Sequence, residues 1–278
     1  MTIQKLLQKN YLAYPHLGAG DIDLILSTSL HRSPDYLYKN NTKQLTSDQI
    51  KAFNKMLLKH LSGWSIAHLA KSKYFFGLKF LVTKHTLIPR PESELMVSTA
   101  LEYLNKQAPK SPKIIDIGTG SSCLILSLAK NYQAKAYYTG VDISKFALKT
   151  ARTNARKLGL KNKVNFKRSN LLKNISPQKF NLVLANLPYL TKEQLKEPSI
   201  KKEPKSALYG GKDGLSYYRR LLNNAPNYLA KKYLIILEID PKQTPEIKKI
   251  IKKYLPKSRV NILTDLAQQD RVVLIQNS

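Results

Sequence analysis

Residues 113–120 read Lys-Ile-Ile-Asp-Ile-Gly-Thr-Gly, and Ser121 and Ser122 follow them. The apolar first half is typical of a buried strand, and Gly118 and Gly120 let the backbone turn tightly into a helix. In an open α/β sheet, ligands bind outside the carboxyl ends of the strands. The stretch therefore predicts the first strand of an α/β sheet with a ligand-binding loop at its end.

From about Ser111 onward the chain alternates between strand-like and helix-like segments. We expect strands over 113–117, 136–141, 164–168, 180–185, 233–239, 259–263 and 272–276, and helices over 145–158, 215–230 and 245–254. Such alternation requires parallel strands with right-handed crossovers. No helix separates the last two strands, so one of them should run antiparallel. The predicted fold is a Rossmann-like, doubly wound α/β sheet of seven strands with a reversed end.

The N-terminal part is expected to be helical, because its apolar side chains recur at helical spacing. Thr46 and Gln49 form a capping signal ahead of one of these helices. No residues in this part are spaced as in a catalytic motif. We therefore expect it to dock a partner or to cover a site. We expect a helical N-terminal docking domain over 1–75, a hairpin linker with an Ile-Pro-Arg-Pro segment over 76–110, and a catalytic domain over 111–278.

The chain is strongly basic: Lys and Arg number 47 against 18 Asp and Glu, for a formal net charge of +29. Such an excess favours nucleic acid, ribosomal or acidic protein partners through long-range attraction. A genome-wide bias towards lysine would give the same numbers. Charge alone therefore leaves both interpretations open.

The remaining composition indicates a cytoplasmic protein without a membrane contact. The single cysteine, Cys123, excludes an internal disulfide and agrees with a reducing compartment. No apolar stretch approaches the ~20 residues that a membrane span needs, and the first residues lack the apolar segment of a signal peptide. The histidines lack metal-ligand spacing, so no metal is expected.

A second motif lies at the end of the second predicted strand, where Asp142 follows the glycine loop by roughly 20 residues. A carboxylate at this place can accept hydrogen bonds from both hydroxyls of a ribose. A nicotinamide enzyme would share these features. The dinucleotide pattern, however, requires a third glycine where Ser122 stands, and the chain lacks a clear second nucleotide-binding half.

A third motif, residues 186–189, reads Asn-Leu-Pro-Tyr and follows the fourth predicted strand. The Asn186 side-chain oxygen and a backbone carbonyl beside Pro188 can accept the two N–H bonds of a planar amide or amine, and Tyr189 can stack on it. The nitrogen lone pair then points at an incoming methyl group, so that catalysis rests mostly on positioning. With the glycine loop and Asp142, the turn indicates methyl transfer from S-adenosylmethionine onto nitrogen.

Together these motifs resemble the PrmC/HemK family of protein-glutamine methyltransferases, over nearly the whole chain. The matching segments are Leu87 to Glu92, Asp116 to Ser122, Asp142, Asn186 to Tyr189, Glu203-Pro204, Ala207-Leu208, Gly210-Gly211, Asp213-Gly214, Asp265-Leu266 and Asp270 to Val272. The helical N-terminal module is also what this family carries.

The resemblance implies a class I S-adenosylmethionine-dependent methyltransferase that yields S-adenosylhomocysteine. It implies the glutamine of the Gly-Gly-Gln motif in class I peptide chain release factors as the substrate, with the N-terminal domain helping to dock the release factor. The implied cofactor residues are Gly118, Thr119, Gly120, Ser121, Ser122, Asp142, Asn170, Leu171 and Asn186. The implied substrate residues are Asn186, Leu187, Pro188, Tyr189, Arg90 and Glu92, of which Asn186, Pro188 and Tyr189 are catalytic.

Three positions depart from the family pattern. Leu187 replaces the first proline of the Asn-Pro-Pro-Tyr motif, as in ribosomal RNA adenine dimethyltransferases; the other residues of the turn hold the amide, so activity should survive. Ser122 replaces the last glycine of the loop and adds a side chain near the cofactor. Asn170 replaces an Asp near the adenine. This replacement removes a negative charge and predicts weaker cofactor binding.

Two other functions stay open on the sequence. An RNA or DNA adenine methyltransferase is favoured by Leu187 and the charge of +29, although it would not be expected to share the Ile-Pro-Arg-Pro and Glu-Pro segments. A ribosome-associated binding protein with a decayed cofactor site is suggested by Ser122 and Asn170. Under the release factor interpretation as well, the basic surface is a candidate for transient contact with the ribosome or RNA.

Overall fold

The computed structural model describes residues 1–277, so Ser278, the last residue of the expected catalytic domain, lies outside the described residues. The chain divides into two compact units, Met1–Ser72 and a larger unit that begins at Lys73. The large sheet and every candidate site residue belong to the larger unit.

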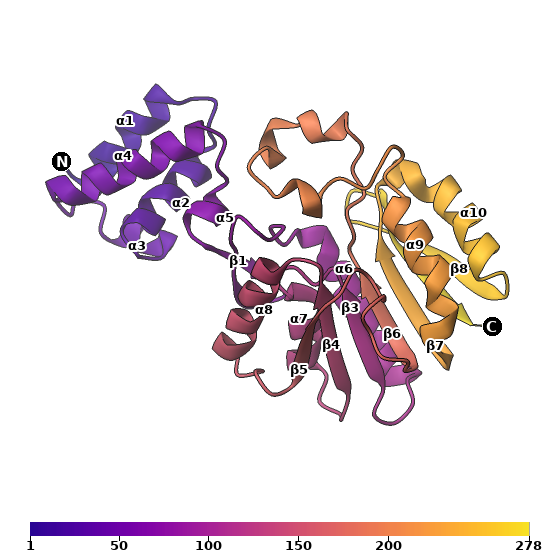
Figure 1. Cartoon of the computed structure of the whole chain (residues 1–278). Coiled ribbons are helices and arrows are strands. Elements are labelled where there is room, and N and C mark those ends of the chain that lie inside the picture. Colours follow the sequence, from indigo (N-terminus) through magenta and orange to yellow (C-terminus); the bar gives the residue numbers. More distant parts are fainter. Residues whose placement is uncertain (278) are drawn as a thin grey trace. The chain divides into compact units, whose positions relative to one another are not determined.

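The first unit is built from helices (Figure 1). They are α1 Ile3–Ala13, α2 Ala19–Ser29, α3 Pro34–Lys39, α4 Ser47–Leu61 and α5 Ile66–Leu69. Their apolar faces share one core that contains the fully buried Ile3, Ile25 and Phe53. Helix α4 starts where the capping pattern predicts, because the side chains of Thr46 and Gln49 each accept the other's backbone N–H. The prediction of a helical N-terminal region is confirmed.

A short hairpin opens the second unit, formed by β1 Ser72–Phe75 and β2 Leu78–Leu81. Phe76 and Gly77 have φ angles of 48° and 70°, and positive φ at both central residues is what a type I′ turn requires. Farther on, Pro91 begins the short 3₁₀ helix η1 Pro91–Ser93, which leads into α6 Glu94–Lys106. Proline suits this first helical position, because its missing N–H has no partner there in any case.

Seven strands form the large sheet, in the order β5-β4-β3-β6-β7-β9-β8. Their bounds are β3 Lys113–Ile117, β4 Tyr137–Asp142, β5 Val164–Arg168, β6 Phe180–Ala185, β7 Leu229–Glu238, β8 Ser258–Thr264 and β9 Asp270–Asn277. Neighbours from β5 to β7 are parallel, whereas β9 runs antiparallel to both β7 and β8. The predicted seven-stranded sheet with one reversed strand near its end is confirmed. Because β3 lies between β4 and β6, the glycine loop lies beside Asp142 and Asn186.

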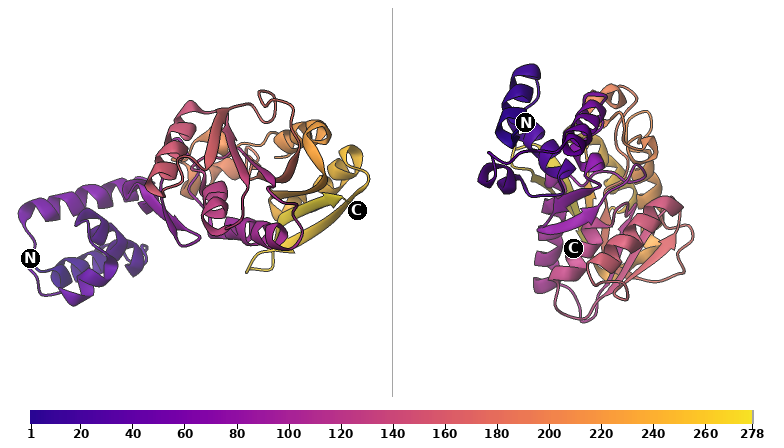
Figure 2. Two further views of the ribbon diagram at one scale, coloured as in Figure 1. Left: turned by 90° about the horizontal axis from the view of Figure 1, so that it is seen from below. Right: turned by 90° about the vertical axis from the view of Figure 1, so that its left-hand side faces the viewer.

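Helices cover both faces of this sheet (Figure 1, Figure 2). They are α7 Cys123–Asn131, α8 Lys145–Lys157, α9 Ser216–Asn224 and α10 Thr244–Tyr254, with α6. Helices α9 and α10 pack against Ile115 and Val183, whereas α6 and α7 pack against the neighbouring residues Ile114 and Leu182. Successive residues of a strand face opposite sides, so β3 is buried on both faces.

The helix predicted over 215–230 is wrong at its C-terminal end. Helix α9 stops at Asn224, the 3₁₀ helix Ala225–Tyr228 follows, and β7 already begins at Leu229. Pro226 explains the break, since it has no N–H to donate and disfavours helical backbone at the residue before it. The other short 3₁₀ helices are Gln194–Lys196, Pro198–Ile200, Lys205–Ala207 and Pro241–Gln243. No helix within residues 1–277 has the length and apolar character to cross a bilayer.

Candidate active site

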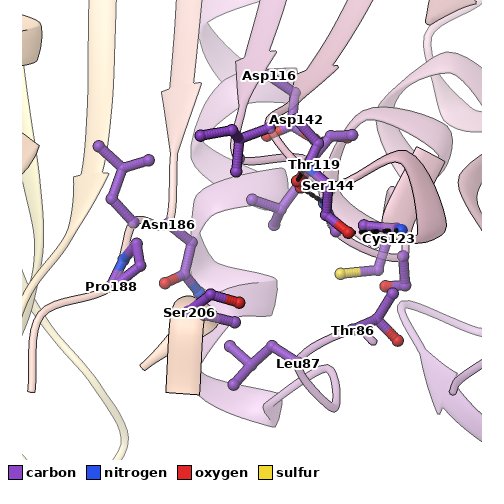
Figure 3. A pocket seen from close by; sticks show the side chains of 18 of the residues that line it. Thr86, Leu87, Asp116, Thr119, Cys123, Asp142, Ser144, Asn186, Pro188 and Ser206 are labelled. Carbon is purple, nitrogen blue, oxygen red and sulfur yellow. Dashed lines mark hydrogen bonds between the residues drawn. The ribbon is translucent and has the colours of Figure 1, made fainter. Parts of the chain in front are cut away.

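A cavity of about 230 Å³ lies at the carboxyl ends of β3, β4, β5 and β6, the edge at which such sheets bind ligands. Figure 3 shows Asn186 and Pro188 on one side of it and Thr119 and Asp142 on the other. The candidate residues on its wall are Arg90, Gly118, Thr119, Gly120, Ser121, Asp142, Asn170, Leu171, Asn186, Leu187 and Pro188. Glu92, Ser122 and Tyr189 do not line it.

The glycine loop is held against the end of β4 by its backbone. The N–H groups of Gly118 and Thr119 both donate to the carbonyl of Val141 at 2.9 Å. Gly118 has a φ of 73°, and a Cβ there would lie 3.0 Å from Cδ2 of Leu187. Leu187 thus fills the space over the glycine. A side chain at position 118 would push the loop and the Asn186 turn apart.

Two carboxyl groups flank the loop, the half-buried Asp142 and the buried Asp116. Asp142 accepts the N–H groups of Gly120 at 2.9 Å and Ser144 at 2.8 Å; burial raises its pKa, and these bonds oppose the rise. Asp116 accepts the Thr119 hydroxyl at 2.5 Å, and burial raises its pKa to about 7. Since a carboxylate has about four lone-pair sites, Asp142 keeps acceptor capacity for a ligand.

Ser122 has left-handed backbone, with a φ of 66°, which is the conformation that glycine adopts without strain. The residue is fully buried, and its Oγ lies 3.1 Å from the Thr119 hydroxyl. Its side chain therefore takes no space from the cavity. The expected extra side chain near the cofactor lies behind the loop.

Asn154, a buried residue of α8, ties the loop to the hairpin, although no motif pointed to it. Its Nδ2 donates to the carbonyls of Ser121 at 2.9 Å and Leu81 at 3.0 Å. Its Oδ1 accepts the Leu81 N–H at 2.7 Å. The sequence signal is faint: an amide on the largely apolar face of the helix predicted over 145–158.

The backbone of the 186–189 turn is held by contacts with Gln243, Tyr218 and Gly214. Gln243 Nε2 donates to the Tyr189 carbonyl at 2.8 Å, and the Tyr218 hydroxyl lies 3.4 Å from the Leu187 carbonyl. Gly214 packs so closely that a Cβ there would lie 2.0 Å from the Tyr189 oxygen. These contacts make the turn a rigid platform beside the cavity.

The acceptors that the turn offers to a ligand are the Asn186 Oδ1 and the Pro188 carbonyl. No hydrogen bond within residues 1–277 ends on either oxygen, and both residues line the cavity. The site therefore presents two hydrogen-bond acceptors at this point.

A buried carboxyl, Glu238 at the end of β7, lies behind the turn. It accepts the hydroxyls of Ser93 and, at 3.2 Å, of Tyr189. Burial, with the negative Glu238 nearby, raises the pKa of Tyr189 above its ordinary range, so that this hydroxyl stays a donor. Neither Ser93 nor Glu238 was singled out from the sequence, where Glu238 is visible only as an acid that ends an apolar strand.

Arg90 borders the cavity and forms an ion pair with Glu203, a residue that is 6% exposed. Glu203 also accepts the Ile88 N–H at 3.0 Å. One carboxylate therefore joins the Ile-Pro-Arg-Pro loop to the segment that follows the Asn186 turn. Glu92, in contrast, is exposed.

Asn170 lies on the cavity wall, and its Oδ1 accepts Nη2 of Arg220 at 2.9 Å. A guanidinium can only donate, which identifies the amide oxygen as the atom that faces Arg220. The Asn170 side chain therefore has N–H donors left, where an aspartate would have only acceptors.

Cys123 also lines the cavity, and burial raises the pKa of its thiol to about 12. A thiol that stays neutral is a poor nucleophile. Within residues 1–277, no three His, Cys, Asp or Glu side chains are placed to share a metal ion.

Similar proteins are known for nearly the full length of the chain. The family model of a methyltransferase domain matches residues 109–267. A release factor glutamine methyltransferase of Bacillus cereus is 33% identical over 265 residues, covering 93% of this chain and 92% of that protein. One of Borreliella burgdorferi is 36% identical over 269 residues, covering 96% and 92%. The chain belongs to the release factor glutamine methyltransferase family.

Solved structures share the fold of this release factor glutamine methyltransferase family member. A methyltransferase from Pyrococcus furiosus has a TM-score of 0.53 at 19% identity and covers 80% of this chain and 98% of its own. Human methyltransferase 10 domain containing protein has a TM-score of 0.52 at 18% identity, with coverages of 73% and 89%. At these identities the likeness concerns the fold alone. The predicted class I methyltransferase fold and the family resemblance are confirmed.

Proposed function

We propose that this chain transfers a methyl group from S-adenosylmethionine to the side-chain amide nitrogen of the glutamine in the Gly-Gly-Gln motif of class I peptide chain release factors. Family membership supports the reaction and the substrate. The observation that carries the proposal is the pair of free acceptors, Asn186 Oδ1 and the Pro188 carbonyl, on the wall of the cavity.

The cavity wall fits S-adenosylmethionine. The loop from Gly118 to Ser121 exposes backbone to the cavity, and Asp142 has spare lone pairs that suit ribose hydroxyls. Asn170 and Leu171 border the same space and would contact the base. When bound, the cofactor supplies an electrophilic methyl group on a sulfonium sulfur. Ser122 contributes only by holding the shape of the loop.

The substrate amide has two N–H groups, and the turn offers two acceptors for them. Bonds to Asn186 Oδ1 and to the Pro188 carbonyl would fix the plane of the amide and aim its weakly nucleophilic nitrogen at the methyl group. Positioning of this kind can supply most of the catalysis. Tyr189 does not border the cavity, and its hydroxyl binds Glu238, so we assign it to holding the turn.

The helical unit, the loop at the entrance of the cavity and the net charge are features with which the enzyme would bind a protein substrate. We assign docking of the release factor to the separate helical unit Met1–Ser72 and the shaping of the entrance to Arg90 and Glu92. The net charge of +29 would attract an acidic partner or ribosomal RNA. A substrate of the translation machinery places the enzyme in the cytoplasm.

Adenine methylation of RNA or DNA is the second candidate, favoured by Leu187. The packing of Leu187 against Gly118 indicates a structural role, because its side chain supplies no polar group for a base.

Labelled S-adenosylmethionine offered to purified release factor, ribosomal RNA and DNA separates these functions. We expect label on the release factor alone, lowered roughly 100-fold or more in Asn186→Ala. Label on nucleic acid alone would overturn the proposal. Absence of measurable cofactor binding in calorimetry would show a decayed site.

A further inference from the structure

Behind the 186–189 turn, side chains from three elements form one buried hydrogen-bonded chain. Ser93 ends η1, Asn186 follows β6 and Glu238 ends β7. Asn186 Nδ2 donates to Ser93 Oγ at 3.2 Å, and the Ser93 hydroxyl donates to Glu238 Oε2. Ser93 and Glu238 are 3% and 2% exposed, so water does not compete for these bonds.

We propose that Ser93 and Glu238 are positioning residues for methyl transfer, which fix the orientation of the Asn186 amide so that its oxygen faces the substrate. The inference rests on the proposed function and assigns a role to two residues outside the family's motif turn.

The direction of the chain follows from what each group can donate. An ionised carboxylate only accepts, so the single hydroxyl proton of Ser93 points at Glu238. The Ser93 oxygen can then only accept from Asn186. A reversed amide would set the Asn186 oxygen against the Ser93 oxygen, two acceptors without a proton between them. Only the observed orientation satisfies all groups.

The charge on Glu238 is supported from several sides. Burial raises its pKa, but the Ser93 and Tyr189 hydroxyls, the positive Arg271 and the Asn186 amide oppose protonation. The Tyr189 hydroxyl donates to the other carboxylate oxygen. Glu238 thus accepts a hydrogen bond on each of its oxygens. As an ionised carboxylate it has no proton to donate to Ser93.

The orientation of the Asn186 amide decides which of its atoms faces the substrate in the cavity. The substrate amide brings two N–H donors and requires two acceptors. With its nitrogen held by Ser93, Asn186 presents Oδ1, on which no hydrogen bond within residues 1–277 ends. A reversed Asn186 would present its own N–H groups to those of the substrate and repel them.

Ser93→Ala removes the acceptor that holds the Asn186 nitrogen at 3.2 Å, and Ser98→Ala is the matched control, since the exposed Ser98 hydroxyl bonds only to carbonyls of its own helix. We expect Ser93→Ala to lower kcat for release factor methylation roughly 10- to 100-fold. The Kd for S-adenosylmethionine in calorimetry should change much less than kcat, because Ser93, which also borders the cavity, makes its hydrogen bonds to Asn186 and Glu238. Ser93→Thr, which keeps the hydroxyl, should restore kcat, and Ser98→Ala should match the wild type.

Glu238→Gln gives a second, nearly isosteric test if the Ser93 variants fold poorly. Its amide can donate to Ser93, which frees the serine proton for Asn186 Oδ1 and favours the reversed amide. We expect a fall in kcat of at least about tenfold with cofactor Kd unchanged. Wild-type kcat in both Ser93→Ala and Glu238→Gln would overturn the proposal.

A spectroscopic measurement separates this inference from the proposed function. In the wild type, the side-chain NH₂ resonances of Asn186, assigned by comparison with Asn186→Ala, should be protected from hydrogen exchange. Protection should be lost in Ser93→Ala and kept in Ser98→Ala. If the wild type methylates no release factor while this pattern holds, the proposed function fails and the orienting role stands. If the wild type is active and the protection is the same in Ser93→Ala, the inference fails.

Discussion

The Asp116 carboxyl, 1% exposed at the end of β3, makes the stability of the fold depend on pH. Burial raises its pKa from 3.8 to about 7, whereas the unfolded chain keeps the ordinary value. Between these two pH values the folded state holds a proton that the unfolded state has lost. The free energy of unfolding therefore falls as pH rises through this window, and the loss is complete above the folded pKa.

Asp116→Asn should remove this pH dependence, because an amide does not ionise. From about pH 5 to about pH 8 the wild type should lose roughly 2 to 3 kcal/mol of unfolding free energy relative to the variant. Denaturant titrations at the two pH values measure the difference. Asp48→Asn is the control, since the Asp48 side chain is 95% exposed. A wild-type-minus-variant difference that does not change with pH would contradict the account.

Gly210 packs directly against the backbone of the catalytic turn, where there is no room for a side chain. A Cβ there would lie 2.5 Å from the Pro188 oxygen and 2.7 Å from the Tyr189 Cα. Gly210→Ala must therefore displace the backbone that holds the substrate amide. We expect kcat to fall roughly 100-fold, as displacements of about 1 Å do.

Gly20→Ala is the control for Gly210→Ala, because a Cβ on this α2 residue would meet nothing within 4 Å. It should leave kcat unchanged and raise stability by up to about 1 kcal/mol. Steady-state kinetics and thermal unfolding check both variants. Wild-type kcat in Gly210→Ala would disprove the role assigned to this glycine.

At the scale of elements, the central strands could be predicted because buried parallel strands read as continuous apolar runs. The prediction overran the end of α9 because it followed the apolar spacing, which runs on past Pro226, and not the proline that breaks the helix. The candidate motifs meet at one cavity because they follow neighbouring strands. The bonds of Ser93 to Glu238, 145 residues away, and of Asn154 to the glycine loop were beyond prediction. Periodicity shows which face is buried, and not which polar groups meet across elements.

The Ile-Pro-Arg-Pro loop is joined to the segment after β6 mainly through Glu203. Arg90→Ala would leave this buried carboxylate without its cation. The expected cost in unfolding free energy is about 1 to 3 kcal/mol, reduced from that of a fully buried pair because the Arg90 side chain is 35% exposed. Arg90→Ala/Glu203→Gln should recover part of this loss, since no uncompensated charge remains.

A double-mutant cycle by denaturant titration tests the Arg90–Glu203 coupling, with Glu203→Gln as the other single variant. Additive effects of the two single substitutions would show that the pair does not couple the loop to the segment.

At the scale of the whole molecule, positive charge exceeds negative by 29. Several of the acids are buried, among them Asp116, Glu203 and Glu238, so they do little to balance the surface. The protein should therefore attract an acidic partner over a distance comparable to the Debye length.

Raising the salt concentration from about 50 mM to about 200 mM should lower kcat/KM for the release factor several-fold, chiefly through KM. Cofactor Kd, measured in the same buffers, is the internal reference and should change less. A kcat/KM that does not respond to salt would show that the charge has no role in recognising the substrate.

The most direct measurement of the central claim is tandem mass spectrometry of release factor peptides after incubation with the enzyme and S-adenosylmethionine. The account predicts one added methyl group on the side-chain nitrogen of the glutamine in the Gly-Gly-Gln peptide, absent when Asn186→Ala replaces the wild type. A methyl group on any other residue, or an unmodified release factor beside methylated nucleic acid, would contradict it.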